Sequence, residues 1–242
     1  MKNILTFNVL LFISALLAGQ KIDYSEDWLS KLENPKNKSD ILNPDNLIDK
    51  YELLDFSSLI KPNTEFLGFI GNDYQRICIS FTKVEKDLNP RIYRISGNSE
   101  VLNNKCDFTG IIEVKQIREF KTLHFGVDEN LKDKGIKVEG ALIGNYKLQE
   151  NRKQSHSGEF TGIMTLYWYI DKNGNLLYDD IRSYSDEYRN NQYIGIWKDY
   201  STKKEKTCNW GEYRIPFSGD LDIGAAEFYP NKKYQDKGWN KK

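Results

Sequence analysis

Phe108-Thr109-Gly110-Ile111 recurs as Phe160-Thr161-Gly162-Ile163, and a looser third copy follows as Tyr193-Ile194-Gly195-Ile196. In each copy the aromatic residue and the glycine are two positions apart, so both lie on the same face of an extended strand. Glycine weakens the interior of a strand, and an aromatic ring packed over it recovers part of that loss in curved sheets. The repeated phrase therefore predicts a strongly curved antiparallel sheet.

Alternation of apolar and polar residues extends this prediction from about residue 65 to residue 214. It is clearest over 136–148, whereas residues 160–170 are apolar on both faces, which indicates a strand that is covered on both sides. Asp171-Lys172-Asn173-Gly174-Asn175 carries the Asn-Gly signal of a hairpin. About nine strands joined by short links predict a mainly β fold, an antiparallel up-and-down meander closed as a calycin-like barrel, with a β-sandwich as the alternative.

The first twenty residues have the pattern of a signal peptide. Lys2 provides the positive start, residues 4–17 are mostly apolar, and Ala18-Gly19-Gln20 supplies small residues for cleavage. The apolar stretch is too short for a membrane span. We therefore expect an exported chain, located in the periplasm or outside the cell, with no membrane span after removal of the signal.

The remaining chain divides into three parts by composition. Residues 21–62 are predicted to form two short helices, one over Ser25–Leu32 and one within 43–54, because both segments have N-terminal capping residues and helical spacing. Helices of this length must pack on other structure, here one end or edge of the sheet. Residues 63–230 are predicted to form the β domain, and 231–242 a frayed tail.

Charge gives no indication of a nucleic-acid partner. The chain has 35 Lys and Arg against 35 Asp and Glu, and removal of Lys2 changes the net charge only from 0 to about −1. A nucleic-acid-binding protein is expected to carry a basic stripe, and an anionic membrane surface attracts polybasic segments. Neither pattern is present, and the identity of any protein partner is left open.

The expected export also affects the three cysteines. In an oxidising environment one pair is expected to form a disulfide. Cys106 and Cys208 lie beside turn-like residues, whereas Cys78 lies within a strand pattern. We predict a Cys106–Cys208 disulfide with Cys78 as a buried thiol. The alternative is three unpaired cysteines, because sequence spacing does not determine the geometry of a bridge.

The sequence offers little for metal or nucleophilic chemistry. His156 is expected at a hairpin tip between serines, and no Gly-x-Ser-x-Gly elbow marks a nucleophile. His124 and His156 are the only histidines, and with scattered cysteines they do not give the ligand spacing of a zinc site. We therefore predict no catalytic residue, no metal and no cofactor.

An acidic cluster near the C-terminus is the main catalytic alternative. Asp220 and Asp222 are two positions apart and share a face if extended, and Glu212 precedes them. Such carboxylates suit calcium, or general acid and base catalysis on a glycan. Alternatively, Arg214 neutralises one of them, and the cluster fastens the end of the barrel.

Aromatic residues in the second half of the β domain are the candidate binding residues: Trp168, Tyr178, Tyr193, Trp197 and Tyr213. Inside a barrel, such side chains provide apolar walls with polar tips, which suit a small apolar or carbohydrate ligand. The predicted function is an exported, non-catalytic binding protein. Its alternatives are a surface glycan hydrolase and a structural or partner-binding surface protein, which a filled barrel and an exposed apolar patch would favour.

Overall fold

The computed structural model describes residues 24–62, 64–186 and 188–240, so the predicted signal peptide lies outside the described residues. The strands are β1 (Leu67–Ile70), β2 (Gln75–Arg76), β3 (Cys78–Lys86), β4 (Ile92–Val101), β5 (Asn104–Glu119), β6 (Val138–Glu150), β7 (Gly158–Ile170), β8 (Leu176–Tyr178), β9 (Asn190–Asp199) and β10 (Glu205–Glu212). The helices are α1 (Tyr24–Glu33), η1 (Lys38–Asp40), α2 (Ile48–Tyr51), α3 (Ser57–Ile60), η2 (Val127–Glu129), η3 (Lys132–Lys134) and η4 (Lys232–Lys237).

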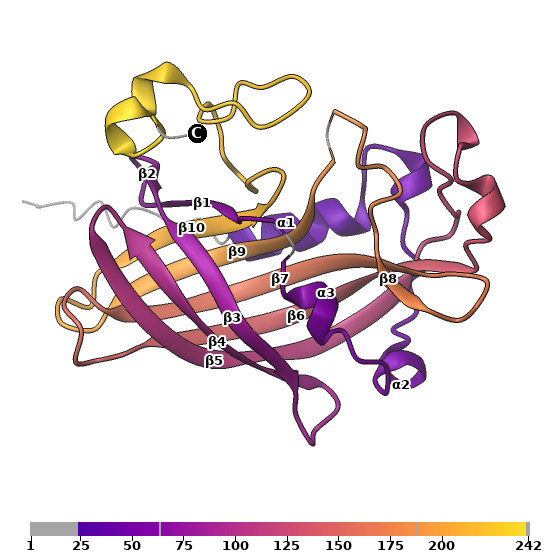
Figure 1. The fold of residues 1–242 in the computed structure, drawn as a ribbon, viewed down its shortest axis with the longest axis horizontal. Coiled ribbons are helices and arrows are strands. Elements are labelled where there is room, and N and C mark those ends of the chain that lie inside the picture. Colours follow the sequence, from indigo (N-terminus) through magenta and orange to yellow (C-terminus); the bar gives the residue numbers. More distant parts are fainter. Residues whose placement is uncertain (1–23, 63, 187, 241–242) are drawn as a thin grey trace, which may run out of the picture.

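The strands form one antiparallel sheet in the order β2-β1-β10-β9-β7-β6-β5-β4-β3, with β8 paired to β7. The sheet is strongly curved, as Figure 1 shows. Aromatic rings cover glycines on neighbouring strands. Gly97 pairs with Phe108, and a Cβ atom at Gly97 would lie 2.7 Å from that ring. Gly140 and Trp168 are partners in the same way. The predicted mainly β, antiparallel and curved fold is confirmed, with the aromatic cover made across strands.

The predicted closed barrel is wrong, because the sheet is curled into a half-barrel (Figure 1). The two ends of the β domain do meet, since Leu67 of β1 pairs with Gly211 of β10. However, β1 has only four residues, and the chain turns back as β2. The amide of Ile77 donates to the carbonyl of Gly68, and among the described residues no ladder continues from β1 along the length of β3. Closure fails because β1 is too short to pair with the nine-residue β3.

The N-terminal segment packs on two different sides of the sheet. Helix α1 contacts β9, where Trp28 packs with Ile163 and Ile194. Helices α2 and α3 lie against the opposite face, and α3 contacts both β3 and β7 across the open side. The prediction of α1 is confirmed. The second predicted helix, within 43–54, is shorter than expected: α2 ends at Tyr51, and the carbonyls of Glu52 and Leu54 accept hydrogen bonds from Lys86. Helix α3 is a separate element beyond the predicted range.

The C-terminal segment crosses over β1 and β2 (Figure 1). Trp239 is buried with Phe69, Ile215 and Leu221, and its Nε1 donates to the carbonyl of Tyr74 at 2.7 Å. A buried indole of this kind fixes the chain that carries it. The tail up to residue 240 is therefore packed rather than frayed.

The two ends of the half-barrel differ in their connections. One end has the turns 71–74, 102–103, 151–157 and 200–204, and we call it the hairpin end. The other end has the segments 87–91, 120–137, 171–189 and 213 onward, together with α2 and α3, and we call it the loop end. Among the described residues, no helix is long and apolar enough to cross a membrane.

Candidate functional site

Several of the predicted binding residues belong to the core of the half-barrel. Trp168 and Tyr193 are completely buried, and Trp197 is 8% exposed. The Tyr193 ring stacks on Trp210 with centroids 4.9 Å apart, and Trp168 contacts the rings of Tyr51 and Phe56. These side chains fill the interior where the sequence predicted a ligand.

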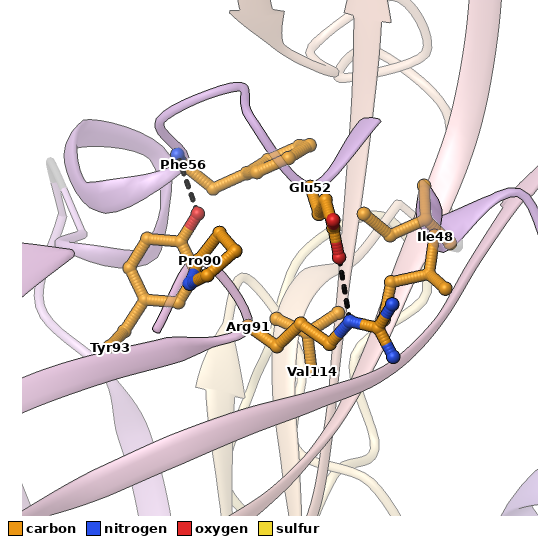
Figure 2. A pocket seen from close by; sticks show the side chains of 8 residues that line it. Ile48, Glu52, Phe56, Pro90, Arg91, Tyr93 and Val114 are labelled. Carbon is orange, nitrogen blue, oxygen red and sulfur yellow. Dashed lines mark hydrogen bonds and ion pairs between the residues drawn. The ribbon is translucent and has the colours of Figure 1, made fainter. Parts of the chain in front are cut away.

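A small pocket is present at the loop end, between α2, the β3–β4 turn and β5 (Figure 2). Its lining residues are Ile48, Glu52, Phe56, Pro90, Arg91, Tyr93, Val114 and Ile117. The space between atoms amounts to about 170 Å³, part of it open solvent, and it leaves no room for an enclosed water molecule. Pockets that hold small ligands usually measure roughly 300–1,000 Å³. The pocket is therefore too small for the predicted ligand.

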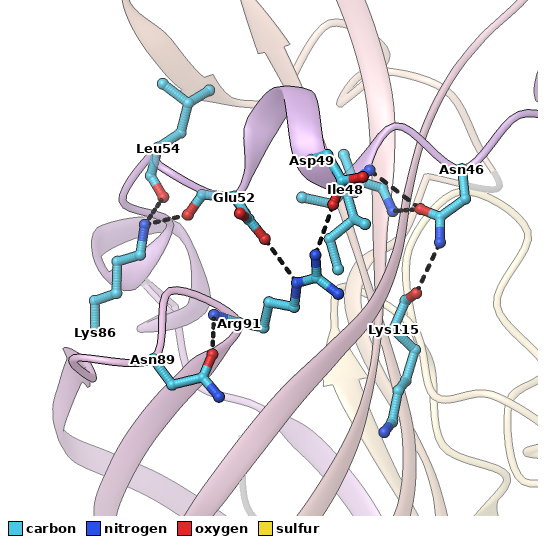
Figure 3. Close-up of polar contacts among 10 residues, drawn as sticks. Asn46, Ile48, Asp49, Glu52, Leu54, Lys86, Asn89, Arg91 and Lys115 are labelled. Carbon is cyan, nitrogen blue, oxygen red and sulfur yellow. Dashed lines mark hydrogen bonds and ion pairs between the residues drawn. The ribbon is translucent and has the colours of Figure 1, made fainter.

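Polar contacts around this pocket attach α2 to the sheet (Figure 3). The Arg91 guanidinium forms ion pairs with Asp49 and Glu52, each at 2.6 Å. Asn46 donates to the Lys115 carbonyl at 3.0 Å, and its Oδ1 accepts the amides of Ile48 and Ile117. All of these contacts are internal to the protein, so we assign them a structural role.

The loop end does bring together two of the predicted residues, Tyr178 and Tyr213. The hydroxyl of Tyr178 donates to Glu212 at 2.9 Å, and burial, reinforced by the Glu212 charge, raises the pKa of Tyr178. The ring of Tyr213 packs edge to face on Tyr188, with centroids 4.7 Å apart. The hydroxyl of Tyr188 donates in turn to the carbonyl of Asp179. The result is a cluster of tyrosines and a carboxylate drawn from β8, β10 and two connecting segments.

Glu212 is the buried centre of this cluster, with only 1% of its surface exposed. Its carboxylate accepts hydrogen bonds from the Thr64 hydroxyl at 2.6 Å and from the Asn191 amide at 3.2 Å, in addition to Tyr178. A register shift between Trp210 and Glu212 interrupts the pairing of β10 with β9 at this point. Neutral donors thus hold a buried carboxylate beneath the tyrosines, a satisfied arrangement that fixes their position.

The acidic residues of the catalytic alternative do not converge on one site. Asp222 forms a largely buried ion pair with Arg214 at 2.6 Å. Asp220 instead contacts Lys233 and the hydroxyl of Tyr234, while Glu212 has the separate partners given above. Within the described ranges, no group of three or more His, Cys, Asp or Glu side chains is arranged to hold a metal ion. The arrangement matches the alternative in which Arg214 neutralises a carboxylate.

Arg214 also joins the two segments that carry exposed tyrosines. Its Nη2 donates to the carbonyl of Asp186 at 2.8 Å and to that of Ala225 at 3.0 Å. Exposure is 87% for Tyr184, 39% for Tyr213 and 52% for Tyr229. We use the name tyrosine surface for Tyr184, Tyr188, Tyr213 and Tyr229, which belong to the two segments that Arg214 joins, and in which Tyr188 and Tyr213 are in ring contact. Of these residues only Tyr213 was predicted as a binding residue.

The backbone of Tyr213 adopts a conformation that the sequence pattern does not predict. Its φ angle is +68°, in the left-handed region that glycine usually occupies. For other residues this conformation costs roughly 1–2 kcal/mol. The neighbouring amide of Arg214 donates to the carbonyl of Glu212 and closes this tight turn, which directs the Tyr213 side chain toward solvent and Tyr188.

The predicted disulfide is not formed, and the alternative of three unpaired cysteines is the one observed. Cys106 lies on β5 and Cys208 on β10, and three strands of the sheet separate them. Burial raises the pKa of both thiols. Cys78, predicted to be buried, is half-buried.

No family model, no curated protein and no solved structure matches this chain.

Proposed function

We propose that this chain is an exported, non-catalytic binding protein for a carbohydrate, and that the ligand lies on the tyrosine surface. The observation that carries the proposal is Tyr213, an aromatic residue that is 39% exposed although its backbone is held in a left-handed conformation. Strained backbone of this kind persists where the surrounding structure enforces it, and it concentrates at functional positions.

Tyrosine suits this ligand class for a chemical reason. One face of a sugar ring presents C–H groups that pack on an aromatic ring, while the phenol hydroxyl and nearby polar groups bond the sugar hydroxyls. Tyr184 and Tyr229 are also more than half exposed, so rings from two chain segments are accessible to solvent. A group of exposed aromatic residues is more informative than isolated apolar residues, because it marks an interaction surface.

The proposal places the ligand on the surface because Trp168, Tyr193 and Trp197 occupy the interior. The hydrolase alternative receives no support from the separate partners of Glu212, Asp220 and Asp222. The filled interior also fits a partner-binding surface protein, so the test must distinguish a glycan from a protein partner.

We expect the purified protein to bind at least one neutral oligosaccharide on a glycan array, with the affinity then measured by calorimetry. Tyr213→Ala should weaken binding about fivefold, since stacking on one ring contributes roughly 1 kcal/mol. Tyr200→Ala is the matched control, because Tyr200 is a half-buried tyrosine of the hairpin end that packs on Arg152. It should bind like the parent protein.

Two results would overturn the proposal. One is an array with no bound glycan, which would favour a protein partner. The other is equal affinity of Tyr213→Ala and the parent protein for the glycan that binds, which would move the site away from the tyrosine surface.

A further inference from the structure

His124 lies in a buried chain of charged groups on the outer side of β6. Its Nδ1 is 2.6 Å from Glu139 Oε1, and its amide donates to Glu139 Oε2 at 2.8 Å. Its Nε2 is 3.3 Å from Asp40 Oδ1. The imidazole is 9% exposed and the Glu139 side chain is fully buried. One histidine therefore links β6, the segment 120–137 and η1 of the N-terminal segment.

Charged groups continue the chain on both sides. Arg182 donates to Asp40 at 2.7 Å, and the buried carboxyl of Asp179 lies near that of Glu139, so that burial and the Glu139 charge raise the pKa of Asp179. Two neighbouring buried carboxyls do not both ionise readily, so we expect one proton between them. With that proton and a charged imidazole, the two remaining carboxylates balance the imidazolium and the guanidinium, so the closed chain is neutral. Loss of both protons would leave two uncompensated negative charges in a buried place, which is costly.

We propose that His124 and Asp179 form a proton-dependent latch that holds η1, the segment 120–137 and the segment 179–182 on the outer side of β6, and that the latch opens when these protons are lost. Each of the four elements supplies a partner, so no single element can leave without breaking a contact to another.

The groups around His124 and Asp179 favour the protonated form of each side chain. Burial alone would lower the pKa of His124, but Asp40 and Glu139 outweigh it and raise the pKa to about 9, despite the opposing charge of Arg182. Burial and the Glu139 carboxylate raise the pKa of Asp179. The titratable neighbours include Tyr167 and Tyr169 of β7 and also Tyr188, whose pKa values burial raises, so these phenols stay neutral. Asp180 lies near Tyr169. Phe120 covers the imidazole edge to face.

These pKa shifts determine how the contribution of the latch to stability changes with pH. Both groups have a folded-state pKa above the ordinary value, so their contribution is complete below the unfolded-state pKa and is lost as pH rises through the folded-state pKa. The latch is therefore closed in neutral and mildly acidic solution and opens in alkaline solution, through about pH 9 for His124.

The latch also reaches the tyrosine surface. The carbonyl of Asp179 accepts the hydroxyl of Tyr188 and the amide of Asn190. Opening should therefore loosen Tyr188, and this last step alone rests on the proposed carbohydrate site. The test below reads the latch without any glycan, so failure of the latch and failure of the binding function are distinguishable.

The experiment is hydrogen exchange followed by mass spectrometry between pH 6.5 and 10, with rates corrected for intrinsic pH dependence. We expect protection in 38–42 and 120–137 to fall at least tenfold as pH rises, while β5–β7 stay protected. In His124→Gln the same segments should already be poorly protected at pH 7, with little further change. His156→Gln is the matched control, because His156 is exposed at the hairpin end; it should behave like the parent protein.

A second measurement keeps the idea testable if His124→Gln folds poorly. Titration of His124 by NMR in the parent protein should give a raised pKa. A His124 pKa near 6.5, or a loss of protection that coincides with global unfolding, would overturn the latch.

Discussion

The hairpin end and the loop end each bury a carboxylate, but they do so in different ways. At the hairpin end, Glu150 accepts hydrogen bonds from the amide of Gly158 at 2.6 Å, from Trp197 Nε1 at 2.9 Å and from Ser99. These donors belong to strands that the hairpin turns bring into register. At the loop end, Glu212 accepts a hydrogen bond from Thr64 and His124 contacts Asp40, both distant in the chain and outside the strands, in addition to partners on strands. One end is therefore fixed by strand pairing, and the other by side-chain contacts between loops.

This difference has a consequence for function. The connections of the hairpin end are shorter than the segments 120–137 and 171–189 of the loop end. The loop end carries the small pocket, the tyrosine surface and the histidine latch, because longer segments can position side chains independently of strand register. Binding residues are commonly carried by loops that a rigid scaffold positions.

The largest effect is expected from removing the side chain of Arg214, which joins the two segments that carry exposed tyrosines. Arg214→Ala leaves Asp222 buried without its cation, and breaking such a pair costs about 3 kcal/mol of unfolding free energy. Lys233→Ala, which removes the partner of the exposed Asp220, is the control and should leave stability unchanged. Urea denaturation of both variants measures the comparison. Equal stabilities would mean that the loop end does not depend on Arg214.

A smaller effect distinguishes the backbone strain at Tyr213 from the role of its ring in binding. Because φ is +68° there, Tyr213→Gly should be more stable than Tyr213→Ala by about 1 kcal/mol, the reverse of the usual order. Both variants lack the ring, so both should lose glycan affinity alike. Thermal unfolding measures the stability of the variants, and calorimetry measures their glycan affinity. If alanine proves as stable as glycine, the left-handed strain is absent in solution.

The smallest effect concerns the hairpin end. Burial raises the pKa of Glu150, even though hydrogen bonds from Ser99, Trp197 and Gly158 oppose the shift. The stabilising contribution is therefore present below the ordinary glutamate pKa and is lost as pH rises through the folded-state value. Glu150→Gln should flatten the decline of unfolding free energy over this acidic to neutral range, whereas His124→Gln should act near pH 9. Glu100→Gln, at an exposed position on β4, is the control. A parent-like pH profile for Glu150→Gln would contradict the assignment.

The sequence predicted the curvature of the sheet and the hairpin at 171–175 because both depend on local signals. Gly174 has φ +87°, and Asp171 accepts the amides of Asn173 and Asn175, as the turn chemistry requires. Closure of the barrel could not be predicted in the same way. It depends on whether β1 is long enough to pair along β3, and no local pattern reports the length of the partner strand.

The loop end was harder to predict for a related reason. Sequence analysis recognised Tyr178 and Tyr213 by residue type, but it placed them in the same interior as Trp168 and Trp197. His124 received no role, because its partners Asp40 and Glu139 lie far from it in the chain and carry no common motif. Contacts between distant loops leave little periodic trace in a sequence.

The folded state protects the three unpaired thiols from oxidation. Burial raises the pKa of Cys78, Cys106 and Cys208, which keeps their sulfur atoms protonated and slow to react. Once the chain unfolds in an oxidising medium, the same three groups become free to cross-link. A bridge between Cys106 and Cys208 would tie together strands that the native order keeps three strands apart. Refolding would then be blocked, so in an oxidising medium the chain must fold before its cysteines are oxidised.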